Sequence, residues 1–132
     1  MLVQPTVRSR PLPVRSGGIA GRRILLAEDD YFIVSDIARA FRAMGAHLIG
    51  PFATVEGVME YLDAAPGLDG AVLDINLRGR MAFAIADRLM REDVPFIFST
   101  GYDDSVIPPR FNGVVRCEKP VRPAAIAKAL FG

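Results

Sequence analysis

The sequence predicts an α/β protein whose five strands form one doubly wound parallel sheet. Short apolar runs alternate along the chain with longer segments in which apolar residues recur every three or four positions. The short runs are typical of strands buried on both faces, and the longer segments of amphipathic helices. Strands separated by helical crossovers favour a parallel sheet with helices on both faces. With 132 residues the chain has the length of one domain.

The first strand and helix follow from one apolar run and the acids after it. Residues 24–27 form a continuous apolar run and predict the first strand. A helix begins at Asp29 or Asp30, which can cap its first turn, and Gly45 ends it. The apolar face of this helix is formed by Ile33, Ile37, Phe41 and Met44.

The next two strand–helix units repeat the pattern. Residues 47–49 predict a short second strand, and Thr54 caps a second helix that continues to Leu62. Residues 71–73 predict the third strand, and residues 81–90 the third helix.

The last part of the chain departs from this alternation. Residues 96–98 and 114–117 predict the fourth and fifth strands, and residues 124–130 a short last helix. Between the fourth and fifth strands there is no apolar stripe, and prolines and a glycine interrupt the segment, at Pro108, Pro109 and Gly113. Such residues argue against more than about one helical turn. We therefore expect the fourth helix to be short or missing.

The first 21 residues differ from the rest of the chain. They carry three arginines and no acid, whereas the remainder has 13 basic and 15 acidic side chains. Frequent prolines and glycines without apolar periodicity predict a flexible basic arm over residues 1–21, ahead of a folded domain over residues 22–132. Two interpretations of the arm stay open, an inert extension and a segment that binds a partner.

Composition excludes several classes of protein. No apolar run approaches the roughly 20 residues of a membrane span, and the N-terminus lacks the apolar core of a secretory signal. No tract of basic residues interleaves with aromatics, as nucleic-acid binding would favour. Cys117 is the only cysteine, so no intramolecular disulfide can form. We expect a cytoplasmic protein that binds neither membranes nor nucleic acid.

Three carboxylates and one lysine stand at the ends of predicted strands. Glu28 and Asp29 follow the first strand, Asp74 follows the third, and Lys119 follows the fifth. Residues at the C-terminal ends of adjacent parallel strands converge on one crevice, so these side chains can share a site. The three acids would repel one another unless a cation lay among them, and oxygen ligands with open positions suit Mg²⁺.

The same residues favour phosphoryl chemistry. An unpaired carboxylate directly after a buried strand is costly, which favours a functional role for Asp74. With Mg²⁺, Asp74 could attack a phosphate donor and form an aspartyl phosphate, while Lys119 and the Thr100 hydroxyl contact the phosphoryl oxygens. The acids at 28–30 alone are explained equally well as charges at a helix N-terminus. A phosphatase is disfavoured, because Asn76 stands where such enzymes usually need a second acid.

Four strings in this order carry a resemblance to a known family: ILLAEDD, AVLDINLRG, FIFSTG and EKP. Over residues 22–131 the chain resembles the receiver domain of bacterial two-component response regulators, which has a flavodoxin-like fold. The resemblance implies that Glu28 and Asp29 bind Mg²⁺ and that Asp74 is the phosphoacceptor and a further metal ligand. It also implies that Asn76 supplies its backbone carbonyl to the metal.

The resemblance also assigns roles to three residues after Asp74, namely Thr100, Lys119 and Pro120. Thr100 is similar to the switch hydroxyl that moves to the phosphoryl group, and Lys119 to the lysine that contacts it. The bond from Lys119 to Pro120 is usually cis in this family, so Pro120 has a structural role.

A finer resemblance concerns the segment PFIFSTGYDDSVIPPRF followed by KP. It is similar to the FAT GUY subfamily of single-domain receivers, which work with histidine kinases of the HWE or a related type. Ser99 stands in place of the motif's alanine, and Arg116 in place of the aromatic switch residue three positions before the lysine.

The resemblance implies a signalling switch rather than an enzyme. A sensor histidine kinase or a phosphotransfer protein would phosphorylate Asp74, and an unidentified downstream protein would read the result. Phosphorylation would shift residues 102–113 between two populations. The alternative is a receiver-like protein-interaction module that is not phosphorylated.

Overall fold

The structure, a computed structural model, describes residues 18–64, 67–101 and 105–132. The central sheet consists of β1 (Arg23–Ala27), β2 (His47–Phe52), β3 (Gly70–Asp74), β6 (Phe96–Thr100) and β7 (Arg116–Glu118). The helices are α1 (Tyr31–Ala43), α2 (Val55–Ala64), α3 (Phe83–Arg91) and α4 (Pro123–Phe131). The five strands are parallel and lie in the order β2-β1-β3-β6-β7. The predicted doubly wound fold is confirmed.

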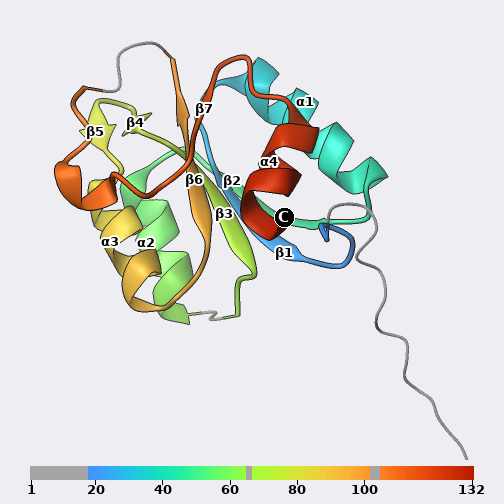
Figure 1. Ribbon diagram of the computed structural model, residues 1–132, viewed down its shortest axis with the longest axis horizontal. Coiled ribbons are helices and arrows are strands. Elements are labelled where there is room, and N and C mark those ends of the chain that lie inside the picture. Colours follow the sequence, from blue (N-terminus) through green and yellow to red (C-terminus); the bar gives the residue numbers. More distant parts are fainter. Residues whose placement is uncertain (1–17, 65–66, 102–104) are drawn as a thin grey trace, which may run out of the picture.

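Helices cover both faces of the sheet and create two cores (Figure 1). Leu25, Leu73 and Phe98 face α2 and α3, whereas Val72 and Ile97 face α1 and α4. Neighbouring residues of a strand point to opposite faces, so a central strand must be apolar at every position. This requirement explains the uninterrupted apolar runs of the sequence. No helix among the described residues has the length and apolar character needed to cross a bilayer.

The helix caps follow the sequence prediction. The Asp30 carboxylate accepts hydrogen bonds from the backbone N–H groups of Phe32 and Ile33, so it is Asp30, not Asp29, that caps α1. The Thr54 hydroxyl accepts one from Gly57 N at the start of α2. Capping by Asp30 leaves the carboxylate of Asp29 available to the site described below.

β2 is longer than predicted and bends at Gly50. Gly50 has a φ of +108°, and a Cβ atom there would lie 2.8 Å from the carbonyl oxygen of Leu26. Only glycine fits this close approach of two strands. Beyond the bend, the carbonyl oxygen of Phe52 accepts a hydrogen bond from Glu28 N at 2.9 Å. The extra residues of β2 therefore hold the backbone of Glu28.

A two-stranded hairpin that the sequence analysis missed lies between β3 and α3. It consists of β4 (Asn76–Leu77) and β5 (Arg80–Met81), joined by Arg78 and Gly79 with φ values of 51° and 86°. Two positive φ values characterise the tight turns of hairpins. Because Arg is unusual at such a position, the sequence carried little signal for the turn. The predicted helix over 81–90 consequently begins only at Phe83.

Among the described residues between β6 and β7, the helical segment is one short 3-10 turn, η3 (Pro109–Phe111). This confirms the short or missing fourth helix. Phe111 is fully buried, stacks on Phe83 and meets the ring of Phe98 edge-on. Its neighbour Arg110 donates two hydrogen bonds to the Asp87 carboxylate of α3. The later part of segment 102–113 is thus packed against the core and α3, whereas residues 102–104 lie outside the described residues. The predicted shift of this segment on phosphorylation stays a prediction.

β7 starts later than predicted, at Arg116 rather than residue 114. Val114 N donates to the carbonyl oxygen of Phe111, so Val114 still belongs to the turn that follows η3. Cys117 in β7 is half-buried, and burial raises the pKa of its thiol. Its side chain packs with the core below α4, as expected for a small apolar residue.

The folded body begins earlier than the predicted boundary at residue 22. Ile19 is completely buried in the core between the sheet, α1 and α4. The Arg22 guanidinium donates to the carbonyl oxygen of Gly18 and lies 4.5 Å from the centre of the Phe131 ring. An isolated apolar residue among glycines has no periodicity that could reveal this packing. The rest of the predicted arm, residues 1–17, lies outside the described residues.

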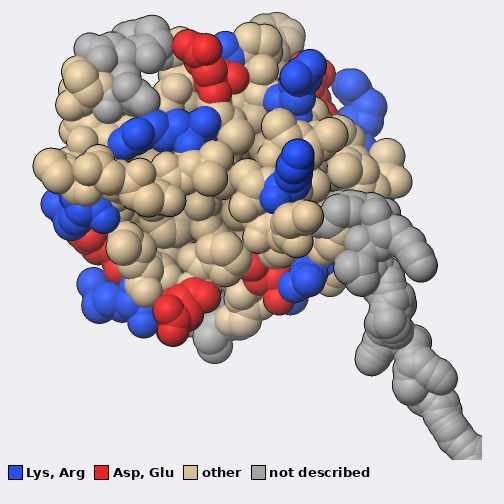
Figure 2. Space-filling model, in the orientation of Figure 1, with Lys and Arg blue, Asp and Glu red and all other residues tan. Residues whose placement is uncertain are grey.

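Basic and acidic side chains are interspersed with neutral ones on the face of the molecule seen in Figure 2.

Candidate functional site

The three predicted acids converge at the C-terminal edge of the sheet. Carboxylate oxygens of Glu28, Asp29 and Asp74 all lie within 4.8 Å of one another. Glu28 and Asp74 are buried, and Asp29 is exposed. β1 and β3 are neighbours in the sheet, and their ends deliver these residues to one place.

Lys119 reaches the same place from β7. Its Nζ lies 2.8 Å from Asp74 Oδ2 and 3.1 Å from Glu28 Oε1. Its backbone N–H donates to the carbonyl oxygen of Thr100 at 2.8 Å, which ties the end of β7 to the end of β6. The Lys119–Pro120 peptide bond is cis. The Lys119 ammonium group therefore bridges Glu28, which follows β1, and Asp74, which ends β3.

One lysine does not offset the accumulated negative charge. Burial and the nearby charge of Asp74 raise the pKa of Glu28 to about 7, although Asp30 N and Lys119 oppose this effect. Burial lowers the pKa of Lys119, but its hydrogen bond with Asp74 and the charges of Asp74 and Glu28 outweigh burial and raise it. Lys119 thus stays protonated, while Glu28 changes between its neutral and ionised forms near pH 7 in the absence of a further cation.

The donor set fits Mg²⁺. Three clustered carboxylates provide oxygen ligands, and burial together with the charge of Asp74 raises the pKa of Glu28, which a divalent cation would counteract. Asp74 Oδ1 accepts a hydrogen bond from Asn76 N at 3.1 Å, and Asp29 Oδ2 accepts one from Arg78 N at 3.2 Å. The other oxygen of Asp74, Oδ2, accepts the hydrogen bond from Lys119 Nζ.

Asn76 and the hairpin build one side of the site. The side-chain carbonyl of Asn76 accepts a hydrogen bond from Gly79 N at 2.7 Å, so this side chain closes the turn. Arg80 forms an ion pair with Glu56 of α2, which attaches the hairpin to the helix layer. The link from the hairpin backbone to Asp29 escaped sequence reasoning, because only the turn geometry creates it.

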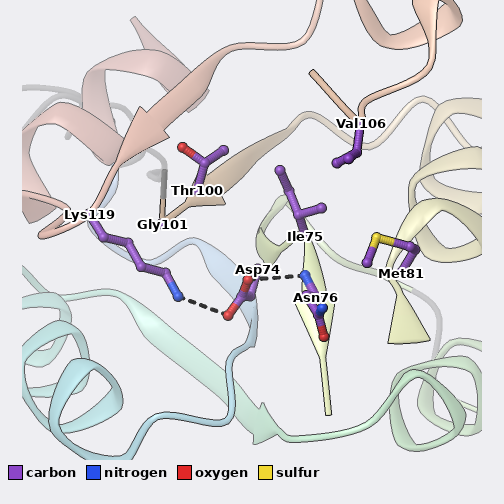
Figure 3. Close-up of a pocket in the computed structure, with 8 residues that line it drawn as sticks. All are labelled: Asp74, Ile75, Asn76, Met81, Thr100, Gly101, Val106 and Lys119. Carbon is purple, nitrogen blue, oxygen red and sulfur yellow. Dashed lines mark hydrogen bonds and ion pairs between the residues drawn. The ribbon is translucent and has the colours of Figure 1, made fainter. Parts of the chain in front are cut away.

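A pocket of about 400 Å³ opens beside Asp74. Figure 3 shows Lys119 on one side of Asp74 and an apolar wall on the other. The pocket is lined by Asp74, Ile75, Asn76, Met81, Thr100, Gly101, Val106 and Lys119. Of these, Ile75, Met81, Gly101 and Val106 were not predicted as site residues. Glycine and apolar side chains carried no chemical signal in the sequence.

Two residues of β6 and β7, Ser99 and Arg116, differ from the residues that the resembled family usually has at these positions. Arg116, which replaces the family's aromatic residue, is half-buried and lies opposite Phe98 in the register of β6 and β7. Ser99 is buried, and its hydroxyl has no hydrogen-bond partner among the described residues. Thr100 is buried too and contributes to the pocket wall.

Solved structures of known proteins resemble this chain. The solution structure of SdrG from Sphingomonas melonis Fr1 has 31% sequence identity and a TM-score of 0.73, covering 83% of this chain and 93% of SdrG. The PhyR stress response regulator has 27% identity and a TM-score of 0.71, covering 89% of this chain and 48% of PhyR. This chain therefore spans about half of PhyR. A response regulator receiver protein from Sinorhizobium medicae WSM419 shares the fold, with 21% identity, a TM-score of 0.69, and coverage of 83% and 91%.

No family model matches the chain, and no curated protein matches it either. The fold, the ordered motifs and the likeness to SdrG nevertheless agree. The chain belongs to the receiver-domain family of response regulators and is a receiver-type regulator.

Proposed function

We propose that this protein is a phosphorylation switch that accepts a phosphoryl group on Asp74. The observation that carries the proposal is the meeting of Asp74 with two further acids and with Lys119, where Asp74 and Lys119 also line an open pocket. Glu28, Asp29 and Asp74, with the backbone carbonyl of Asn76, would hold Mg²⁺. The metal would supply positive charge to the transferred phosphoryl group when bound.

The residues around Asp74 have separate tasks in this proposal. The Asp74 carboxylate attacks phosphorus, and Lys119, which now contacts Oδ2, neutralises charge on a phosphoryl oxygen. Thr100 lines the same pocket and offers its hydroxyl as a further donor. Asn76 stands two residues after Asp74, where a phosphatase would usually carry a general acid, and this favours an acceptor that keeps the phosphoryl group. The protein then acts as a switch rather than as a turnover enzyme.

The structural change that follows phosphorylation would begin at the end of β6. Phosphorylation adds roughly two negative charges to Asp74, and Thr100 would move toward them. Gly101 and Val106 border the pocket, whereas Ile107 and Phe111 are buried and anchored. We expect the response at Gly101 and Val106 rather than along the full connection to β7.

The proposed donor is a sensor histidine kinase of the HWE or a related type, or a phosphotransfer protein, in the cytoplasm. The resemblance of the FIFSTGY segment to the motif of the FAT GUY subfamily supports this choice. The chain is also similar to the BeF3-activated conformation of SdrG from Pseudomonas melonis Fr1, with 31% identity and a TM-score of 0.68. A downstream protein would read the phosphorylated form.

The test is labelling of the protein by phosphoramidate with and without Mg²⁺. We expect a hydroxylamine-labile phosphoryl group that requires Mg²⁺ and is absent from Asp74→Asn. Asp36→Asn serves as the matched control, because Asp36 is an exposed acid on α1. Unchanged labelling of Asp74→Asn would contradict the site. A wild-type protein that takes no label would favour the unphosphorylated interaction module instead.

A further inference from the structure

The pocket beside Asp74 is larger than a phosphoryl group requires. Its volume is about 400 Å³, whereas one water molecule occupies roughly 30 Å³ in the liquid and a phosphoryl group has only four heavy atoms. Room therefore remains for a second chemical group next to the phosphoryl position.

The unused part of the pocket is apolar on one side. Ile75 is buried at its base, and Met81 and Val106 stand at its rim with 41% and 55% of their surface exposed. Only six large hydrophobic residues are strongly exposed among those the structure describes, and two of them meet here. Figure 3 shows these three side chains on the side of Asp74 that is away from Lys119.

The geometry of phosphoryl transfer indicates what occupies this space. The attacking and leaving atoms lie roughly in line through phosphorus, so the leaving group points away from the attacking carboxylate. Lys119 lies on one side of Asp74, and the apolar part of the pocket on the other side offers space for the leaving group. Apolar side chains at that place cannot bind charge, but they can pack against a ring.

We propose that Met81 and Val106, above Ile75, form a subsite for the leaving group of the phosphodonor, suited to a flat ring such as the imidazole of a phosphohistidine. The proposal rests on the phosphoacceptor function proposed above. The flexible methionine side chain can adapt to a ring, and its sulfur interacts favourably with aromatic edges. Met81 and Val106 are in this view residues that select the donor.

The transfer step balances without a further reactant. A bond forms between an Asp74 carboxylate oxygen and phosphorus while the phosphorus–nitrogen bond of the donor breaks. The departing nitrogen keeps the electron pair of that bond. The other ring nitrogen is protonated beforehand, and its positive charge stays hydrated at the exposed rim formed by Met81 and Val106; the ring then leaves as neutral imidazole.

The experiment compares two small phosphodonors, phosphoimidazole and phosphoramidate. Both break a phosphorus–nitrogen bond, but only the first has a ring as its leaving group. The pocket variants are Met81→Gln and Val106→Thr, which keep the size of the side chain and remove its apolar character. The matched controls are Met90→Gln and Val115→Thr, because Met90 and Val115 are 46% and 47% exposed and do not line the pocket.

The readout is the ratio of the two labelling rates within each variant, which cancels any change in the folded fraction. We expect the ratio of phosphoimidazole to phosphoramidate to fall about fivefold in each pocket variant, equivalent to about 1 kcal/mol, and to stay unchanged in the controls. An equal loss with both donors, or an unchanged ratio, overturns the subsite and leaves the phosphoacceptor proposal intact. A wild-type protein that is labelled by neither donor overturns both.

Discussion

At the scale of single residues, the buried acid Glu28 is the most unusual feature of the site. It lies 3.1 Å from Lys119 and close to Asp74, out of contact with solvent. Burial and the charge of Asp74 raise its pKa to about 7, so its charge changes within the physiological range of pH. In the proposed metal site, a proton and Mg²⁺ would compete for the Glu28 carboxylate.

This competition predicts that Mg²⁺ affinity increases with pH. Below about pH 7 the metal must displace a proton from Glu28, and above it the carboxylate is already ionised. Isothermal titration calorimetry from about pH 5.5 to about pH 8 should show affinity that rises and then levels off. Glu28→Gln should bind Mg²⁺ more weakly and lose most of this pH dependence. Affinity that is independent of pH in the wild type would contradict the raised pKa.

The same pKa predicts how stability depends on pH without metal. Because the folded pKa lies above the ordinary value of 4.5, the folded state holds the proton more tightly than the unfolded chain. This stabilisation is complete below about pH 4.5 and is lost as pH rises through about 7, with a contribution of about 3 kcal/mol at most. Urea denaturation in EDTA should show a smaller decline over this range for Glu28→Gln than for the wild type.

Ser99 provides a third prediction at this scale. A buried hydroxyl without a partner costs about 1–3 kcal/mol, and Ser99 has none among the described residues. Ser99→Ala should therefore raise the free energy of unfolding by about 1 kcal/mol, as measured by urea denaturation. A loss of stability would instead indicate that the hydroxyl is hydrogen-bonded in solution.

At the scale of elements, η3 replaces a helix as the cover of the sheet next to α3. Phe111 fills the core between Phe83 and Phe98, and the ion pair of Arg110 with Asp87 closes the contact from outside. An exposed ion pair contributes little, so the buried ring holds the element in place. The segment between β6 and β7 is therefore divided into a part near the pocket and an anchored part.

Because the Phe111 ring holds the anchored part of this segment in the core, we expect its removal to lower the stability of the protein strongly. Phe111→Ala should lower the free energy of unfolding by about 3 kcal/mol, because it leaves a cavity in the core. Phe32→Ala is the matched control, since Phe32 is largely exposed at the start of α1, and it should change stability by less than about 0.5 kcal/mol. Chemical denaturation of both variants measures the difference. Equal changes in the free energy of unfolding for the two variants would show that the Phe111 ring does not hold η3 in place.

At the scale of the whole molecule, the parallel sheet brings residues far apart in sequence to one edge. Lys119 contacts Asp74 although 45 residues separate them. The neighbouring connection carries Gly101 and Val106 at the pocket and Phe111 in the core. A change at Asp74 should thus reach one end of that connection and stop at the buried ring.

The expected result is a local response to activation. With Mg²⁺ and beryllofluoride, which mimics a phosphoryl group, the amide resonances of Gly101 and Val106 should shift strongly in heteronuclear NMR spectra. Those of Phe111 and Asn112 should shift little. Comparable shifts along the whole connection to β7 would show that η3 also moves and would contradict the anchored arrangement. Asp74→Asn under the same conditions separates acceptor effects from effects of the ions alone.

Sequence reasoning found most of the strands and helices because their signals are local. Apolar runs, helical periodicity and caps depend on neighbouring residues, as the caps at Asp30 and Thr54 illustrate. It missed the hairpin at Arg78 and the packing of Ile19, where an unusual φ value and a single buried residue leave no periodic pattern. The start of β7 moved by two residues, because the turn after η3 takes up Val114.

The sequence by itself determined the doubly wound sheet and the convergence of Glu28, Asp29, Asp74 and Lys119, since strand order places the C-terminal ends together. Only the tertiary structure decided that Glu28 titrates near neutral pH and that Met81 and Val106 wall the pocket. Burial, charge environment and cavity shape arise from packing between distant segments. Such properties leave no trace in the spacing of residues along the chain.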